Sequence, residues 1–263
     1  LGCGGVTRVL IEPTITGHRT LAVDFLRASA LECKHVVLAT VFESEGIPGL
    51  MPGQRLAMGH EKPMRCDISD DLVRAWIADE VRIRWASREE KRHPTATTLR
   101  YERGRGWASV LIEMLRPLPH VWIFGAGYDA RPIVSLVSSM GWRASVVDHR
   151  PSFALPERFP DAHQVVIVSP HQWPDDLAIE PNSAAIIMTH SFLQDQFVLR
   201  QIAHIGLDYI GILGPHKRTQ RLLEDIEERP VRAPFAPVGL DLGAETPEEI
   251  ALSIVAEIQA TRL

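Results

Sequence analysis

The feature that most constrains this chain is an alternation of short apolar runs with helix-like segments, which begins near residue 120. Alternation of this kind indicates parallel strands joined by crossover helices. Runs that are apolar on both faces fit a sheet covered by helices on both sides. We therefore predict a Rossmann-like α/β domain over 120–263, with a doubly wound parallel sheet. The expected strands are 121–124, 144–148, 164–168, 184–188 and 209–213, and the expected helices are 130–140, 195–204, 218–228 and one that starts at Thr246.

The part of the chain before residue 120 is less regular. Its pattern predicts strands over 6–11 and 35–42, and helices over 19–33 and 69–80, the second with Ser69 as N-cap. Residues 87–106 are charged and poorly periodic, so they indicate either an exposed hairpin or a linker. We predict a smaller α+β domain over 1–100 and a linker over 101–119.

Composition excludes several classes of protein. The net charge is −5, so no basic surface for nucleic acid is expected. The longest apolar runs are far shorter than the ~20 residues that a membrane span needs. The chain has three cysteines and no Cys-x-x-Cys pair, which argues against a disulfide framework and a zinc site. A reducing cytoplasm is the expected location.

A glycine turn directly follows the first strand of the predicted Rossmann domain. Gly125, Gly127 and Ala130 form the pattern Gly-x-Gly-x-x-Ala, in which the first glycine permits a tight turn and the second lets a phosphate approach the backbone. The second strand ends at Asp148, 21 residues after Gly127, where NAD-binding folds place the acid that binds a ribose hydroxyl. An NAD(P) site is therefore one interpretation.

Two side chains inside this turn complicate that interpretation. Asp129 lies in the first helical turn, where its carboxylate is expected either to cap its own helix or to compete with a pyrophosphate for the free N–H groups. Tyr128 is expected to stack on a planar ring of a ligand. The same residues are equally consistent with a purely structural turn.

Further candidates follow the fourth and fifth predicted strands. Carboxyl ends of parallel strands face the crevice of an open α/β sheet, so Thr189 and His190 are candidate phosphate or ring ligands. Gly214, Lys217 and Arg218 follow the fifth strand and suit a phosphate as well. The structural alternatives are a helix N-cap at Thr189 or Ser191 and a solvated first helical turn around Lys217.

Several stretches together resemble one family. They are LGCGG (1–5), IFGAGYDARP (123–132), GWRASVVDHRPSFALPERFP (141–160), MTHSFLQD (188–195), YIGILGPHKRTQRLL (209–223) and PVGLDLGAETPEEIALSIVAEI (237–258). On these stretches the chain resembles the XdhC/CoxI family of maturation factors for xanthine dehydrogenase and related molybdenum hydroxylases. The Asp-Ala-Arg-Pro sequence at 129–132 is typical of a distinct branch. The segment that usually precedes Gly-Cys-Gly-Gly in the family is expected to be missing.

The resemblance implies a non-enzymatic role. It implies binding and protection of the molybdenum cofactor (molybdopterin) and its insertion into an apo molybdenum hydroxylase of the xanthine dehydrogenase type. It further implies Cys3, in the Gly-Cys-Gly-Gly motif, as a soft thiolate ligand for molybdenum. A cysteine desulfurase is a candidate sulfur donor and a homodimer a candidate assembly.

Two other functions stay open at this point. One is an NAD(P)-dependent oxidoreductase that uses the glycine turn, although no Tyr-x-x-x-Lys pair for hydride transfer is present. The other is an assembly protein that has lost its ligand. Neither the client enzyme nor the form of the pterin cofactor can be inferred from these residues.

Overall fold

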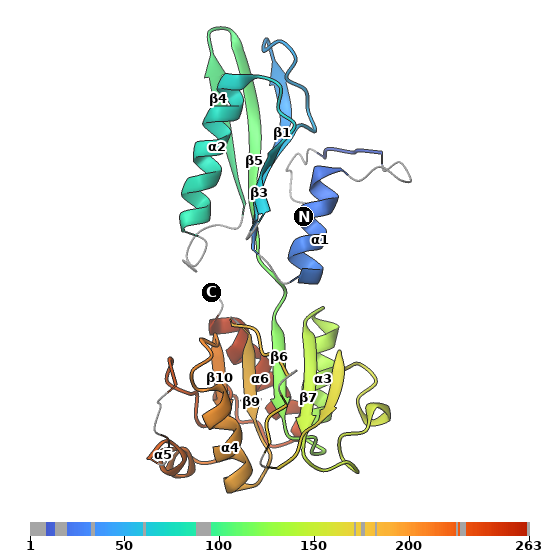
Figure 1. Ribbon diagram of the computed structural model, residues 1–263, viewed down its shortest axis with the longest axis vertical. Helices are drawn as coiled ribbons and strands as arrows, with labels where there is room; N and C mark the ends of the chain where they lie inside the picture. The colour runs from blue at the N-terminus through green and yellow to red at the C-terminus, as the bar shows by residue number, and fades with distance from the viewer. Residues whose placement is uncertain are drawn as a thin grey trace, which may run out of the picture. The chain divides into compact units, whose positions relative to one another are not determined.

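The structure is a computed structural model, and it divides into two compact units, Leu1–Pro117 (unit 1) and Leu118–Leu263 (unit 2). The described residues are 9–13, 20–32, 35–59, 62–87, 96–170, 172–174, 177–181, 183–224, 226 and 230–261. Figure 1 labels most of the helices and strands of both units.

Unit 1 is built on a five-stranded antiparallel sheet of order β3-β2-β1-β5-β4. Its helices pack on opposite faces of this sheet, because α2 covers the buried residues Val37, Ala39 and Val41 of β1, whereas α1 lies against Val36 and Leu38. The elements are α1 (Leu21–Glu32), β1 (Val36–Glu45), β2 (Arg55–Gly59), β3 (Lys62–Cys66), α2 (Asp71–Ala86), β4 (Ala96–Arg103) and β5 (Gly106–Leu115). The predicted α+β class of this part is confirmed.

Three details of unit 1 differ from the prediction. The expected linker over 101–119 is wrong for residues up to Leu115, because β4 and β5 form a hairpin in the sheet. Asp70, one residue after the expected Ser69, is the N-cap of α2, and its carboxylate accepts the N–H groups of Leu72 and Val73. Residues 9–11 form no strand, and the start of that expected strand lies outside the described residues.

Unit 2 is a five-stranded parallel sheet of order β10-β9-β6-β7-β8. The strands are β6 (His120–Phe124), β7 (Arg143–Asp148), β8 (Gln164–Ile167), β9 (Ala184–Ile187) and β10 (Tyr209–Ile212). The helices are α3 (Ala130–Ser139), η1 (Pro156–Arg158, a 3₁₀ turn), α4 (Phe192–Ile202), α5 (His216–Glu224) and α6 (Pro247–Thr261). The order reverses between β6 and β9, which is the Rossmann arrangement, so the predicted fold class is confirmed.

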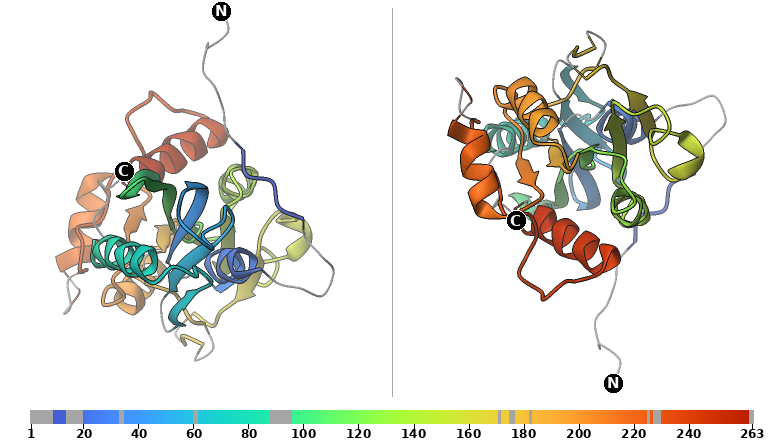
Figure 2. Two further views of the ribbon diagram at one scale, coloured as in Figure 1. Left: turned by 90° about the horizontal axis from the view of Figure 1, so that it is seen from above. Right: turned by 90° about the horizontal axis from the view of Figure 1, so that it is seen from below.

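Helices cover both faces of the parallel sheet. Helices α3 and α6 pack on the face that carries Ile123, Val146 and Ile186, whereas α4 and α5 pack on the face that carries Phe124 and Ile187. Figure 2 (right) shows these two helix pairs on either side of the sheet. Alternate residues of one strand therefore belong to two different cores, which explains why the strand sequences are apolar throughout.

Two predicted helix ends in unit 2 are confirmed. At the start of α6, the Thr246 N–H donates to the Glu249 carboxylate (3.0 Å) and the Glu249 N–H donates to the Thr246 hydroxyl (3.3 Å), which is the expected capping box. These bonds hold the pKa of Glu249 below its ordinary value. After α3, Gly141 takes the left-handed conformation with φ of 74°.

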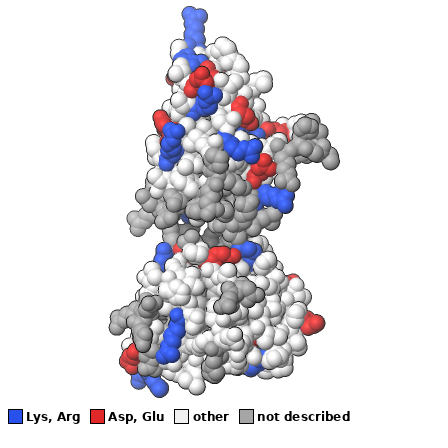
Figure 3. All heavy atoms as spheres, in the orientation of Figure 1, with Lys and Arg blue, Asp and Glu red and all other residues white. Residues whose placement is uncertain are grey.

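The charged side chains do not form a broad basic area on the face drawn in Figure 3, where lysines and arginines of the described residues alternate with acidic ones. Within the described residues, no helix is both long enough and apolar enough to cross a bilayer.

Candidate functional site at the carboxyl edge of the parallel sheet

The candidate site lies where the strand order reverses, at the carboxyl ends of β6, β7, β9 and β10. Open α/β sheets bind ligands at this position, because two loops diverge from adjacent strands and leave a crevice between them. The candidates Gly125, Gly127, Tyr128 and Asp129 follow β6. Asp148 ends β7, Thr189 and His190 follow β9, and Gly214 follows β10.

Gly125 brings the turn after β6 into direct contact with the segment after β9. Its φ is 126°, a conformation that side chains rarely adopt, and a Cβ atom here would lie 2.4 Å from the carbonyl oxygen of Met188. Its N–H donates to the Val147 carbonyl of β7 (2.8 Å). Glycine is therefore required here to join three strand ends, whatever the site binds.

The space beside the second glycine, Gly127, is filled by a side chain of the protein. A Cβ atom on Gly127 would lie 2.3 Å from the Asp129 carboxylate oxygen Oδ1 and 3.7 Å from His190 Nε2. In dinucleotide-binding folds this space lets the pyrophosphate approach the backbone. Here the Asp129 carboxylate occupies it.

Asp129 does not cap its own helix. It stands at the N-cap position of α3, but its side chain makes no capping hydrogen bond, so the capping alternative is wrong. Instead Asp129 Oδ2 lies 2.9 Å from His190 Nε2, which joins the loops after β6 and β9. The pairing leaves the N-terminal amides of α3 without the side-chain acceptor that the sequence predicts.

His190 is held in a strained conformation. It has φ of 59°, and no other described residue except glycine has positive φ. A left-handed residue other than glycine costs about 1–2 kcal/mol, which surrounding contacts must offset. The imidazole is 58% exposed, so one ring nitrogen bonds Asp129 while the rest of the ring faces outward. Strain of this kind is common where a side chain must point at a ligand.

Both carboxylate oxygens of Asp148 accept hydrogen bonds from within the protein. Its side chain has no exposed surface, and its two oxygens accept the Ala126 N–H (2.6 Å), the Arg150 N–H (2.9 Å) and two guanidinium nitrogens of Arg150 (2.9 and 2.7 Å). Burial alone would raise the pKa of Asp148, but the bonds from Arg150 and Ala126 outweigh it and hold the pKa below its ordinary value. Asp148 therefore fixes the glycine turn to Arg150, which acts as a structural clamp.

A second buried carboxylate lies under the β9 end of the site. Asp195 of α4 is 1% exposed and accepts the N–H (3.2 Å) and the hydroxyl of Thr189, and it forms an ion pair with Arg218 of α5. The Thr189 hydroxyl is thus engaged inside the protein. Ser191 is the N-cap of α4, but its side chain makes no capping bond.

An open pocket remains on the β9–β10 side of the edge. It has a volume of about 230 Å³ and is lined by Met188, His190, Leu213, Gly214 and Arg218. The pocket combines the His190 imidazole with the Arg218 guanidinium from the first turn of α5, and both side chains can donate to an anion. We call it the β9–β10 pocket. Lys217 is exposed on the same first turn and does not line the pocket.

The candidate Tyr128 lies on another surface. Its ring is 68% exposed, with the Arg131 guanidinium carbon 5.6 Å from the ring centre. Both side chains line a shallower hollow of about 310 Å³ that also contains Arg158 and Glu248. The structure therefore does not bring Tyr128 into the β9–β10 pocket.

The predicted metal ligand Cys3 lies outside the described residues. Within the described part of the chain, no group of three or more His, Cys, Asp or Glu side chains could hold a metal ion. The role of Cys3 stays a prediction.

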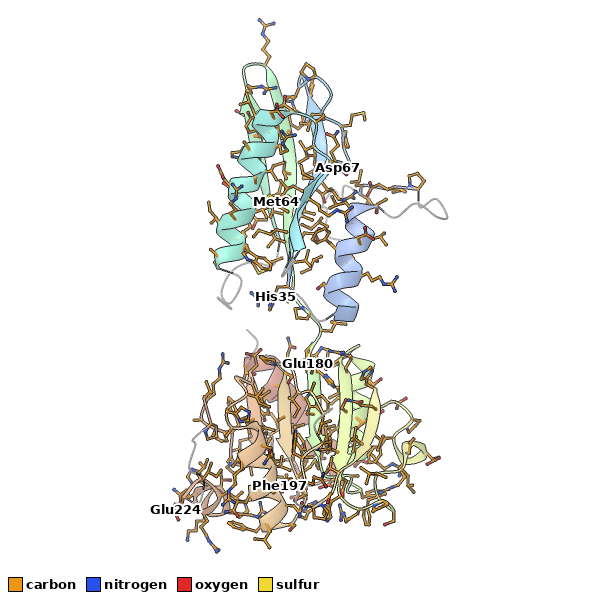
Figure 4. All side chains as sticks on the ribbon, in the orientation of Figure 1. His35, Met64, Asp67, Glu180, Phe197 and Glu224 are labelled. Carbon is orange, nitrogen blue, oxygen red and sulfur yellow. The ribbon has the colours of Figure 1, made fainter. Side chains whose placement is uncertain are left out.

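The sequence patterns miss a polar cluster at the opposite end of the sheet. His120 Nδ1 lies 3.1 Å from Glu180 Oε2, and His120 Nε2 lies 2.7 Å from the Ser145 hydroxyl. Figure 4 shows Glu180 beside the start of β6. Burial opposes ionisation of Glu180, but the bond from His120 prevails and lowers its pKa to about 2. Ser145 is completely buried, so this Ser-His-Glu arrangement joins strands and has no access to a substrate.

Comparison with known proteins identifies the family. The XdhC Rossmann domain matches residues 121–258, which is more than half of the chain, so the chain belongs to the XdhC family. A curated relative from Bacillus subtilis (strain 168), named as a probable xanthine dehydrogenase subunit, is 37% identical over 168 residues, which cover 64% of this chain and 50% of that protein. The "Uncharacterized protein YqeB" of Escherichia coli (strain K12) is 30% identical over 159 residues, which cover 58% of this chain and 29% of that protein.

A solved structure supports the fold of both units. A xanthine dehydrogenase from Bacillus halodurans aligns with a TM-score of 0.53 and 23% identity, covering 90% of this chain and 94% of that one. At this identity the likeness concerns the fold alone. The chain spans half or less of the length of the two curated relatives.

Proposed function

We propose that this protein is a maturation factor that binds the molybdenum cofactor and delivers it to an apo molybdenum hydroxylase of the xanthine dehydrogenase type, without turnover of its own. Membership of the XdhC family and the name of the Bacillus subtilis relative support the coarser role in maturation. The observation that carries the finer proposal is the β9–β10 pocket, which offers an anion site at the edge where α/β folds bind ligands.

The residues of the pocket fit the phosphate end of a pterin cofactor. Arg218 provides guanidinium donors beyond the nitrogen that it shares with Asp195, and His190 provides an exposed imidazole. Gly214, with φ of 121°, keeps the backbone close to the pocket without a side chain. When bound, the cofactor supplies the metal and its dithiolene sulfurs, and the side chains of this chain bind and orient its phosphate.

The size of the pocket suggests how such a cofactor is presented. Pockets that enclose a whole small ligand usually have volumes of about 300–1,000 Å³, whereas the β9–β10 pocket has about 230 Å³. It accepts one end of the cofactor and leaves the remainder accessible. A carrier must transfer its ligand to an acceptor, and holding the cofactor by the phosphate leaves the pterin and the metal free to enter the client enzyme.

The alternative of an NAD(P)-dependent oxidoreductase is less well supported. The hollow beside Gly127 contains the Asp129 carboxylate, where a pyrophosphate would be repelled. The expected ribose acceptor, Asp148, already has Arg150 and Ala126 as partners. We infer that both contacts typical of a dinucleotide are taken by side chains of the protein.

The proposal is tested by cofactor transfer. The intact chain is mixed with molybdenum cofactor released from a molybdoenzyme, bound pterin is measured by fluorescence after oxidation, and activation of apo xanthine dehydrogenase is then assayed. The substitution His190→Asn is suitable because asparagine tolerates the left-handed conformation. We expect cofactor affinity to fall about tenfold in His190→Asn, a loss of ~1.4 kcal/mol.

The matched control is Arg221→Ala, because Arg221 is exposed on the same helix α5 and does not line the pocket. Its affinity should equal that of the unchanged chain. Absence of cofactor uptake by the unchanged chain would exclude the proposal. A cysteine desulfurase partner, a homodimer, a cytoplasmic location and a metal bond to Cys3 stay predictions.

A further inference from the structure

Unit 1 contains a second cavity that the proposed function does not use. It lies on the sheet face opposite α2, where α1 covers β1 and β2, and its volume is about 960 Å³. We call it the unit 1 pocket. Its apolar wall comes from the segment before α1, from α1 itself and from the sheet, through Val9, Leu10, Ala22, Leu26, Leu38 and Leu111.

Strand register places polar side chains on the floor of this pocket. Thr40 of β1 pairs with Arg55 of β2 on one side and with Leu111 of β5 on the other. In the neighbouring row on the same face, Glu113 of β5 pairs with Leu38 of β1. Diagonal neighbours on one face of an antiparallel sheet lie within reach of each other, so the side chains of Thr40 and Glu113 line the same part of the pocket.

Two of these polar residues are buried without full partners. Thr40 is 6% exposed, and among the described residues its hydroxyl has no hydrogen-bond partner. Arg55 is 7% exposed; its terminal nitrogens bind Glu12 and the Gly53 carbonyl, but its Nε has no partner. Buried polar groups are nearly always hydrogen-bonded in folded proteins, because each unpaired group costs free energy. Of the two, the Thr40 hydroxyl can accept a hydrogen bond from a ligand in the pocket, whereas the Arg55 Nε–H is itself a donor and cannot be completed by another donor.

The charges around the pocket define the head group of that ligand. The Arg55 guanidinium is already neutralised by Glu12, whose pKa is lowered by this bond. The Glu113 carboxylate lines the pocket and has no hydrogen bond or ion pair with any described residue, although its charge also acts on the nearby Arg55 guanidinium. A carboxylate in partly apolar surroundings favours a cation or a strong N–H donor.

We propose that the unit 1 pocket binds a small amphipathic organic cation. Its apolar body packs against Leu10, Leu26 and Leu111, and its ammonium or amidinium head donates to the Glu113 carboxylate and the Thr40 hydroxyl. This site is independent of the β9–β10 pocket, because all of its lining residues belong to unit 1.

The test uses three probes with the same apolar body and different heads: 4-phenylbutylamine, 4-phenylbutanol and 5-phenylpentanoate. Each is titrated into the intact chain by calorimetry. We expect the amine to bind about tenfold more tightly than the alcohol, and the carboxylate more weakly than both. Equal binding of the amine and the carboxylate, or no binding of the amine at millimolar concentration, overturns the proposal.

Substitutions then locate the site. Glu113→Gln should abolish the preference for the amine over the alcohol, whereas Glu102→Gln, an exposed acid on the neighbouring strand β4 outside the pocket, should leave it unchanged. Thr40→Val removes an unpartnered hydroxyl, so it should fold at least as stably as the unchanged chain and bind the amine several-fold more weakly. Retention of the full preference in both Glu113→Gln and Thr40→Val overturns the proposal, as does a chain dimer that excludes all three probes.

Discussion

The two halves of the carboxyl edge of the parallel sheet differ in how their polar groups are used. On the β6–β7 half, Asp129 pairs with His190 and Asp148 pairs with Arg150 and Ala126, so both carboxylates have partners inside the protein. On the β9–β10 half, His190, Gly214 and Arg218 line an open pocket. The comparison shows that the glycine pattern determines the backbone of the turn, whereas neighbouring side chains determine whether a ligand can reach it.

The largest expected effect is a loss of stability when the backbone contact that joins the two halves is disturbed. Gly125→Ala places a Cβ atom 2.4 Å from the Met188 carbonyl oxygen at a φ of 126°, so unit 2 should lose more than about 4 kcal/mol of unfolding free energy. Urea unfolding followed by circular dichroism measures this loss. Gly206→Ala is the control, because a Cβ there meets no atom within 4 Å, and its stability should change by less than about 0.5 kcal/mol. Similar stability of the two variants would show that the turn does not depend on Gly125.

A smaller loss of stability is expected from the clamp on the β6–β7 half. Asp148→Asn removes a buried charge from its bonds with Arg150 and should cost about 2–3 kcal/mol. Because the folded-state pKa of Asp148 is lowered, its contribution is present above the ordinary pKa near 4 and is lost as the pH falls through the lowered folded value. Stability measured between pH 7 and pH 3 should therefore decrease less in Asp148→Asn than in the unchanged chain.

The exposed carboxylate Asp161 provides the comparison for this measurement, since Asp161→Asn should keep both the stability and the pH profile of the unchanged chain. A pH profile of Asp148→Asn that follows the unchanged chain would contradict the assignment of the clamp.

The strands of the two units were unequally predictable. In unit 2, runs such as residues 184–187 are buried on both faces, so composition alone indicates a strand. In unit 1, β4 alternates exposed and half-buried residues and carries charges on its exposed face, so the sequence left an exposed hairpin and a linker both open, and the hairpin is the one that forms. The strands β2 and β3 are five residues each and contain Gly, Pro and charged residues, so no local pattern marks them.

The sequence predicted where in the fold the candidate site lies, but it did not predict which side chains contact each other there. Topology placed His190 and Asp129 at the same edge, but their pairing joins residues 61 apart and depends on the left-handed backbone of His190. Arg218 was recognisable only as a basic residue after a strand, because its ion pair with Asp195 connects two helices. Side-chain partners of this kind arise from packing between elements, which no local pattern encodes.

The smallest expected effect is a gain of dinucleotide binding at the β6–β7 half when Asp129 is replaced. This measurement is also the most direct test of the central claim. The account holds that Asp129 itself fills the hollow where a pyrophosphate would bind. Asp129→Ser empties the hollow, and the fold should tolerate it, because serine is a good N-cap residue for α3. The measurement is a calorimetric titration of NAD into the unchanged chain, Asp129→Ser and the control Asp161→Ser. We predict no binding by the unchanged chain or the control, and weak but measurable binding by Asp129→Ser; binding of NAD by the unchanged chain that Asp129→Ser does not strengthen would contradict the account.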